Sequence, residues 1–206
     1  MLSEELKVKI RAGLKEAFET AVFVIVMVII IRFFVGEIRW IPSGSMKPTL
    51  IEGDRIFVER VSRFFATPKR GDVMVFYPPM EPLKKTPTAV FERLTGFFCK
   101  DIAYIKRVVG LPGDKILIKP DADGKYAVYV NGKRLEENYI MDPYDYIPCS
   151  EKMYCGPMTV PQNNYFMMGD NRGNSQDSRF WGFLPKERFV GRAVVLFWPL
   201  NRIKGL

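Results

Sequence analysis

An uninterrupted apolar run near the N-terminus is the feature that most constrains this chain. The stretch AVFVIVMVIII, residues 21–31, is wholly apolar, and the run extends over residues 17–35 if Glu19 and Arg32 are allowed near its ends. As a helix, residues 17–35 span about 28 Å at about 1.5 Å per residue, close to the hydrocarbon thickness of a bilayer. We therefore expect one transmembrane helix over residues 17–35.

The apolar run and its flanking residues fit neither a cleaved signal peptide nor a buried core helix. A cleaved signal peptide needs a small-x-small cleavage site, and the following residues, RFFVGEIRW, offer none. A buried core helix would have polar residues breaking up the run. Basic residues are denser within residues 7–15 than after the run, where Arg32 and Arg39 stand. The positive-inside rule then favours a cytoplasmic N-terminal segment, residues 1–16, and an extracytoplasmic body, residues 36–206.

The rest of the chain has the texture of a mainly β protein. Short runs of β-branched and aromatic residues alternate with Gly, Pro, Asn and Asp, as expected for strands. The sequence predicts strands over residues 55–60, 72–77, 103–109, 115–119, 126–130, 164–168 and 192–198. Asn131-Gly132 predicts a hairpin with a type I′ turn. Helical spacing recurs at residues 88–98, either as a flap on the core, which is favoured, or as an apolar surface resting on a bilayer.

Charge and cysteine content exclude some classes of function. The formal net charge is +8, but the basic residues are scattered and often adjacent to acids, so we expect no nucleic-acid partner. Cys149 and Cys155 bracket the loop CSEKMYC, which has no zinc-ligand spacing. They form either a loop disulfide or, as in many cytosolic proteins, free thiols. Neither a metal nor an organic cofactor is indicated.

The absence of histidine restricts the chemistry most strongly. A Ser-His-Asp triad is impossible, so a serine nucleophile here needs another base. Lysine can serve if burial lowers its pKa towards neutrality. Two stretches supply the groups: IPSGSMKPTL, residues 41–50, holds Ser43 and Ser45 between two prolines, and AYIKRVVGLPGD places Lys106 on one strand face with Tyr104 and Val108. A lysine pointing outward from an edge strand would give the same pattern.

A third stretch, GDNRGNSQDSRFWGF at residues 169–183, is rich in turn-forming and hydrogen-bonding residues. It fails as a twelve-residue calcium loop, because Arg172 and Trp181 stand where oxygen ligands are required. A tight loop whose Asp and Asn side chains cap their own backbone is the structural alternative.

Taken together, PSGSMKPTL, GDRIFVER, RGDVMVF, YIKRVVGLPGD and GDNRGNSQDSRFWGF, in this order after a membrane anchor, resemble the sequence boxes of bacterial type I signal peptidases. The resemblance runs from about residue 35 to about residue 198. The N-terminal segment and a variable insertion at residues 78–101 carry little of it. It implies a catalytic domain built from antiparallel sheets in a partial barrel, preceded by one transmembrane helix. Gly173 departs from the family, which often has an acidic residue there.

The resemblance also implies roles for individual residues. Ser45 corresponds to the nucleophile, Lys106 to the general base, and Ser43 to a side-chain oxyanion donor that works with the backbone N–H of Ser45. Ser175 corresponds to a serine that hydrogen-bonds the lysine. Supporting roles fall to Gly169 near the site and to an ion pair between Asp177 and Arg179. The expected lining of shallow pockets for small P1 and P3 residues is Ile41, Pro42, Met46, Leu50, Tyr104 and Ile105.

These roles imply a membrane-bound serine endopeptidase that removes signal peptides after Ala-x-Ala-like sites, on the outer side of the bacterial cytoplasmic membrane. Its partners would be preprotein signal peptides, the phospholipid bilayer and the translocation machinery. The resemblance favours the Cys149–Cys155 disulfide. A self-cleaving Ser/Lys regulator should be soluble and carry a DNA-binding motif, so the anchor argues against it. A non-catalytic, membrane-tethered β-domain that binds peptides or envelope partners is the alternative from another class.

Overall fold

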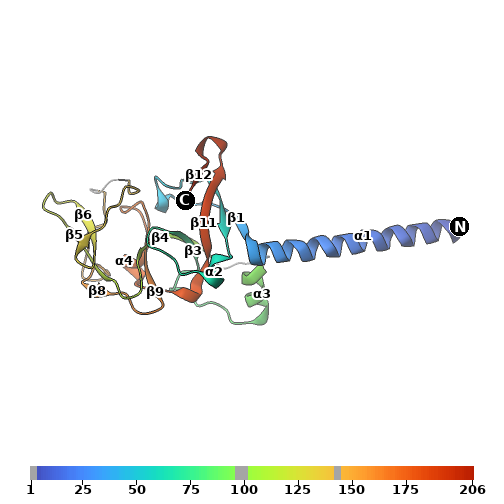
Figure 1. Cartoon of the computed structure of the whole chain (residues 1–206), viewed down its shortest axis with the longest axis horizontal. Helices are drawn as coiled ribbons and strands as arrows, with labels where there is room; N and C mark the ends of the chain where they lie inside the picture. Colours follow the sequence, from blue (N-terminus) through green and yellow to red (C-terminus); the bar gives the residue numbers. More distant parts are fainter. Residues whose placement is uncertain (1–3, 96–101, 142–144) are drawn as a thin grey trace.

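The computed structural model describes residues 4–95, 102–141 and 145–206, and consists of a long N-terminal helix attached to a β-rich body (Figure 1). Helix α1 (Glu4–Ile30) continues into the π-helical turn η1 (Ile31–Val35). It projects away from the body, and Phe23 in its middle is 65% exposed. The helical stretch Val8–Val35 is long and apolar enough to cross a membrane, and none of its most apolar window is buried in the protein. The helix is therefore not a core helix.

The helix begins earlier than the apolar run. Residues 4–16 are mostly good helix formers such as Glu, Leu, Lys and Ala, so the helix extends back to Glu4 without a break. The segment before the expected span is thus helical wherever it is described.

The body contains two sheets in which every strand pair is antiparallel, which confirms the predicted mainly β fold. The larger sheet has the order β1–β2–β11–β3–β4–β9–β10, with β12 beside β11, and the smaller has the order β7–β6–β5–β8. The larger sheet comprises β1 (Gly36–Trp40), β2 (Arg55–Glu59), β3 (Val73–Phe76), β4 (Tyr104–Gly110), β9 (Asn164–Met168), β10 (Leu184–Pro185), β11 (Phe189–Trp198) and β12 (Lys204–Gly205). The smaller sheet, at the end of the body far from α1 in Figure 1, comprises β5 (Lys115–Pro120), β6 (Tyr126–Val130), β7 (Lys133–Arg134) and β8 (Met158–Thr159).

All seven predicted strands are present, and the strands missing from the prediction are mostly short. Asn131 and Gly132 have φ angles of 53° and 81° between β6 and β7, as the predicted turn requires. Strands β8, β10 and β12 have two residues each, too few for an alternating pattern. Strand β1 follows the apolar run directly and was not expected.

The central strands are apolar on both faces because hydrophobic clusters cover both sides of the sheet. In β3, Val73 and Val75 belong to one core cluster, while Met74 and Phe76 belong to another on the opposite face. A third cluster fills the space beneath the smaller sheet and includes Ile116, Val128 and Phe166. The catalytic candidates lie where the loop of residues 41–54 meets the β4 and β9 edge of the larger sheet.

The remaining helices are short. They are α2 (Ser62–Phe65), α3 (Pro87–Thr95), α4 (Ser178–Trp181) and the 3-10 turns η2 (Gly44–Met46), η3 (Lys186–Arg188) and η4 (Leu200–Arg202). Helix α3 overlaps the predicted helix over residues 88–98 but begins one residue earlier, at Pro87. The last three residues of the predicted helix fall outside the described part, as does Cys99. The favoured prediction that this helix packs in the core is wrong for Val90 and Phe91, because both side chains are exposed.

Candidate active site

The candidate nucleophile, Ser45, lies in the short turn η2 and is held from both directions. Within the loop, Met46 is fully buried and anchors the turn in the core. From the other side, the backbone N–H of Asn171 donates to the carbonyl oxygen of Ser45 at 3.1 Å, and its side-chain amide donates to the carbonyl oxygen of Gly44 at 3.0 Å. The turn is therefore fixed to the loop that follows β9.

Lys106 of β4 contacts Ser45 of η2 directly. Its Nζ donates hydrogen bonds to Ser45 Oγ at 2.7 Å and to the carbonyl oxygen of Ile105 at 3.0 Å. Strand alternation places the lysine stem between Tyr104 and Val108, as the sequence predicted, and Nζ lies 5.5 Å from the centre of the Tyr104 ring. Lys106 is only 4% exposed. A hydroxyl and a buried amine are thus in direct contact.

Burial makes this amine a weaker base than an ordinary lysine. Loss of hydration lowers the pKa of Lys106 from 10.5 to about 8, because the ammonium is the form that burial disfavours. The nearby carboxylates of Asp177 and Asp170 act in the opposite direction, while Arg179 lowers the pKa further. A substantial fraction of neutral amine near physiological pH is the consequence, and only that form can accept a proton.

The loop after β9 supports the site through an ion pair. Arg179 Nε and Nη2 each lie 2.9 Å from an oxygen of Asp177, and neither side chain is exposed. Asp177 also caps α4 by accepting from the backbone N–H of Arg179, and it accepts from the N–H of Gly169 at 3.1 Å. A Cβ at Gly169 would lie 2.5 Å from the carbonyl oxygen of Ser45 and closer still to the Ser175 hydroxyl. Only glycine fits between the two loops.

Ser175 is placed beside the site but differs in its bonding from the expectation. Its hydroxyl is buried and has no hydrogen-bond partner among the described residues, so the expected bond to Lys106 is not formed here. Lys106 as an ammonium has three protons, of which Ser45 and Ile105 take two. The third proton and the unpaired hydroxyl of Ser175 are therefore complementary.

A groove of about 400 Å³ runs along the site, and part of its expected lining is found there. Pro42, Tyr104 and Ile105 line it, together with Ile102 and Ala103. Other lining residues are Ser43, Gly44, Ser45, Lys106, Asn174 and Gln176. Three expected lining residues lie instead in the hydrophobic core against which Ala103 and Ile105 pack, namely Ile41, Met46 and Leu50. In the loop of residues 41–50 these apolar side chains point inward, which leaves the serines at the surface.

Sequence reasoning missed a second buried ion pair, which lies next to the pair of Ser45 and Lys106 that we call the dyad. Arg107 donates to both oxygens of Asp170, at 2.8 and 2.6 Å, and its Nη1 donates to the carbonyl oxygen of Gly71 at 2.8 Å. These bonds tie β4, β9 and the turn before β3 together. Strand alternation puts Arg107 on the face opposite Lys106, and that was the available signal; its acidic partner is distant in sequence.

Cys149 and Cys155 are joined by a disulfide with an Sγ–Sγ distance of 2.00 Å. The bridged loop contacts α4, since the backbone N–H of Tyr154 donates to the carbonyl oxygen of Arg179 at 2.7 Å. Among the described residues, no cluster of His, Cys, Asp and Glu could hold a metal ion.

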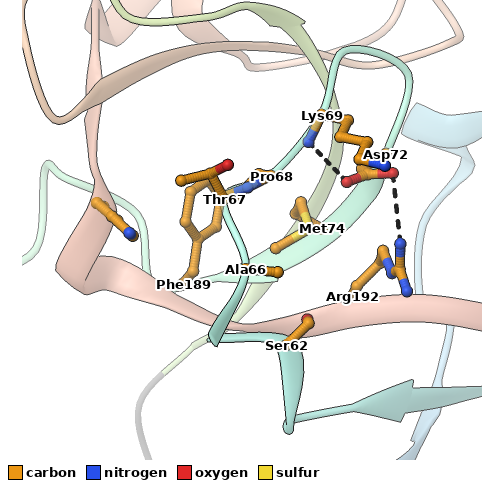
Figure 2. Close-up of a pocket in the computed structure, with 10 residues that line it drawn as sticks. Ser62, Ala66, Thr67, Pro68, Lys69, Asp72, Met74, Phe189 and Arg192 are labelled. Atoms are coloured by element: carbon orange, nitrogen blue, oxygen red, sulfur yellow. Dashed lines mark hydrogen bonds and ion pairs between the residues drawn. The ribbon is translucent and has the colours of Figure 1, made fainter. Parts of the chain in front are cut away.

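A second cavity, of about 270 Å³, lies between α2, β3 and β11 (Figure 2). Asp72 accepts from the backbone N–H of Lys69 at 2.8 Å and lies 3.8 Å from Arg192. The hydroxyl of Ser62 is already bonded to Glu59. The Ser62 hydroxyl is therefore not placed as a nucleophile in this cavity, and Met74 is another of the lining residues.

Comparison with known proteins shows which families and sequences this chain resembles. The chain matches the family model described as signal peptidase, peptidase S26, over residues 14–198. It is 43% identical over 198 residues to signal peptidase I of Leptolyngbya laminosa, covering 96% of this chain and 86% of that protein. It is 42% identical over 190 residues to probable signal peptidase I-2 of Synechocystis sp., covering 91% of this chain and 75% of that protein. A crystal structure of a signal peptidase I from Enterococcus faecalis V583 aligns with a TM-score of 0.43 and 25% identity, covering 62% of this chain and 97% of that one.

These matches define the class of protein first: the chain is a serine endopeptidase. Within that class, the chain belongs to the signal peptidase family, peptidase S26, because the family model covers most of its length.

Proposed function

We propose that this protein removes N-terminal signal peptides from exported preproteins, with Ser45 as the nucleophile and Lys106 as the general base. The observation that carries the proposal is the 2.7 Å contact between Lys106 Nζ and Ser45 Oγ in a chain without histidine. The names of the matched relatives support signal peptides as the substrate class.

The reaction begins when the neutral amine of Lys106 takes the proton of the Ser45 hydroxyl as Oγ attacks the carbonyl carbon of the scissile bond. The tetrahedral intermediate collapses as the Lys106 ammonium protonates the leaving amine, which releases the mature protein. Lys106, again neutral, then removes a proton from water, and the resulting attack on the ester releases the signal peptide and restores Ser45. A base with a pKa of about 8 can perform both the deprotonation and the return of the proton.

The developing oxyanion needs donors beside Ser45. The backbone N–H of Ser45 lies at the beginning of η2, where N–H groups have no acceptor within the turn. Ser43, the residue before η2, has an extended backbone and borders the same groove. We assign the two oxyanion donors to the Ser43 hydroxyl and this N–H. Ser43→Ala should then lower kcat by about 10²- to 10³-fold with a smaller effect on KM, and Ser43→Thr should recover part of the loss.

Ser175, Asp177, Arg179 and Gly169 act as positioning residues. The Ser175 hydroxyl accepts the third proton of the Lys106 ammonium, which turns the amine towards Ser45. The buried Asp177–Arg179 pair fixes α4 and the start of the loop that carries Ser175.

Substrate enters the groove as an extended strand beside β4. Strand β9 pairs with β4 from Arg107 onward, so the edge of residues 104–106 is available to a peptide. Pro42, Tyr104 and Ile105 line the groove, and we expect its walls to favour small side chains and therefore cleavage after Ala-x-Ala-like sequences.

Helix α1 spans the bacterial cytoplasmic membrane once, with its N-terminus in the cytoplasm and the body, residues 36–206, outside. Ser45 follows the end of η1 by ten residues, so the reaction centre lies near the membrane surface, where a signal peptide emerges from the translocation machinery. Tethering both partners to one surface raises their effective concentration.

The test is cleavage of a purified preprotein by the full chain in phospholipid vesicles, with the cut site read by mass spectrometry. Ser45→Ala and Lys106→Ala should each abolish cleavage, and Lys106→Arg should not restore it because a guanidinium stays protonated. The matched controls are Ser150→Ala and Lys133→Ala, which alter exposed residues and should retain parental activity. Near-parental cleavage by Lys106→Ala, with the fold intact by circular dichroism, would refute the dyad.

A further inference from the structure

Helix α3 is held against the point where the N-terminal helix ends. It packs on η1 and lies beside this end of the helix in Figure 1. The buried side chain of Arg60 joins the two, donating to the carbonyl oxygen of Arg32 in η1 at 3.3 Å and to that of Arg93 in α3 at 2.8 Å. The position of α3 relative to the end of the N-terminal helix is therefore fixed.

A group of large apolar side chains is exposed around this junction, and we call it the exit surface: Phe34, Val35, Phe65, Val90 and Phe91. Phe91 of α3 is 54% exposed and Phe65 of α2 is 87% exposed. Helix α2 belongs to the same region, because the backbone N–H of Arg60, two residues before it, donates to the carbonyl oxygen of Val35. None of the five belongs to a hydrophobic core cluster of the described structure.

The composition of this surface suits one occupant. Exposed apolar side chains gathered at one place mark an interaction surface, and these are continuous with a helix whose own apolar surface needs lipid. Lys84 and Lys85, just before α3, are both exposed, and lysines next to an anionic membrane surface are attracted to it. Apolar side chains with flanking lysines are the pattern of a helix that lies in the membrane interface.

We propose that α3 lies in the plane of the bilayer interface, with Val90 and Phe91 at the boundary between headgroups and acyl chains, so that the exit surface forms a second contact with an anionic membrane. This inference rests on the proposed function, in which α1 spans the bilayer. It assigns a role to the insertion at residues 78–101, which contributes none of the proposed catalytic residues.

This contact positions the substrate groove. Ile102, which lines the groove, follows Thr95, at the end of α3, by seven positions in the sequence. Seven fully extended steps along the chain reach at most about 25 Å. The β4 wall of the groove therefore stays within about 25 Å of the interface. The loop of residues 41–54, which carries Ser45, follows η1 and β1 along the chain, so it is also held near the interface. Both walls of the groove therefore face emerging signal peptides at a fixed distance from the interface.

The test places a nitroxide spin label at residue 91 of the full chain, using Phe91→Cys in a Cys99→Ser background. Controls carry the label at Val24→Cys within α1 and at Lys133→Cys in β7, at the end of the body far from α1. The proteins are reconstituted in vesicles of phosphatidylcholine and phosphatidylglycerol, and collision of the label with oxygen and with a water-soluble nickel complex is measured. The proposal expects the labels at residues 24 and 91 to favour oxygen and the label at residue 133 to favour nickel.

The outcomes separate the two proposals. A label at residue 91 that behaves like the one at residue 133, while the label at residue 24 is in lipid, overturns the interfacial helix and leaves the anchor standing. A label at residue 24 in water overturns the anchor and the interfacial helix together.

A functional measurement gives an independent readout. Phe91→Ser should raise KM for a membrane-inserted preprotein about five- to tenfold and leave cleavage of a short soluble peptide in detergent unchanged. Met141→Ser, which alters a residue of similar exposure, should change neither. Equal KM values for Phe91→Ser and the parent on the inserted preprotein would count against the interfacial contact.

Discussion

Replacing Lys106 by methionine should make the protein inactive. It should also raise the free energy of unfolding relative to the parent, and this gain should be larger at neutral pH than at alkaline pH. The pKa of Lys106 is about 8 in the fold and 10.5 without it, a difference of about 2.5 units. Between these two values the unfolded chain binds one proton that the folded chain does not, so the stability contributed by this lysine rises with pH. Below pH 8 the fold bears the full cost of a buried ammonium, roughly 3 kcal/mol.

The Lys106→Met variant lacks this proton, while all other titrating groups are shared with the parent and cancel in the difference. The free energy of unfolding of the variant minus that of the parent follows from the two pKa values. This difference should fall by about 2 kcal/mol between about pH 7 and pH 9.5. Urea unfolding of the full chain in detergent, followed by the near-ultraviolet circular dichroism of the β body, measures this difference. A difference that stays constant across this range would show that burial does not lower the pKa of Lys106.

Three further substitutions test the surroundings of the dyad. Met74 of β3 lies directly opposite Lys106 of β4 in the sheet and also lines the cavity of Figure 2. Met74→Ala should therefore let water approach the lysine and raise the midpoint of the pH profile of kcat/KM above about 8. An unchanged midpoint would contradict this. Gly169→Ala should lower kcat at least tenfold with little change in the circular dichroism spectrum, because its methyl group displaces the Ser45 carbonyl. Asp170→Asn leaves Arg107 buried without its anion and should cost about 3 kcal/mol in urea unfolding; a cost below about 1 kcal/mol would mean that the pair is dispensable.

The fold was predictable where a local pattern carries the information. Strands β2 to β6 read as strands because each is buried on at least one face and bounded by turn residues. The turn at Asn131-Gly132 was predictable because its φ angles depend on the two residues themselves. Strand pairing order was not, since β11 lies between β2 and β3 although it follows them by more than a hundred residues.

The site was predictable in its parts but not in its assembly. Ser45 and Lys106 each stand in an unusual stretch, yet 61 residues separate them, and only the family resemblance joined them before the structure placed the two groups in contact. Ile41, Met46 and Leu50 were expected at the groove because of the family resemblance, but their side chains lie in the core. The loop of residues 41–54 has no regular periodicity from which inward and outward side chains could have been told apart. Asn171 reads in sequence as a solvated loop residue, although its two hydrogen bonds hold the nucleophile turn.

The buried arginines resolve a conflict between the structure of the loop and the chemistry of the lysine. Asp177 is needed where it is, because it caps α4 and accepts from Gly169, and Asp170 binds β9 to β4 through Arg107. Both carboxylates, however, stabilise an ammonium at Lys106 and thereby raise its pKa. Each aspartate is paired with its own arginine through two hydrogen bonds. The arginine offsets most of the effect of the aspartate's negative charge on Lys106, so burial remains the dominant influence on the pKa of Lys106. A Ser/Lys pair can therefore stand beside two aspartates and still supply a neutral base.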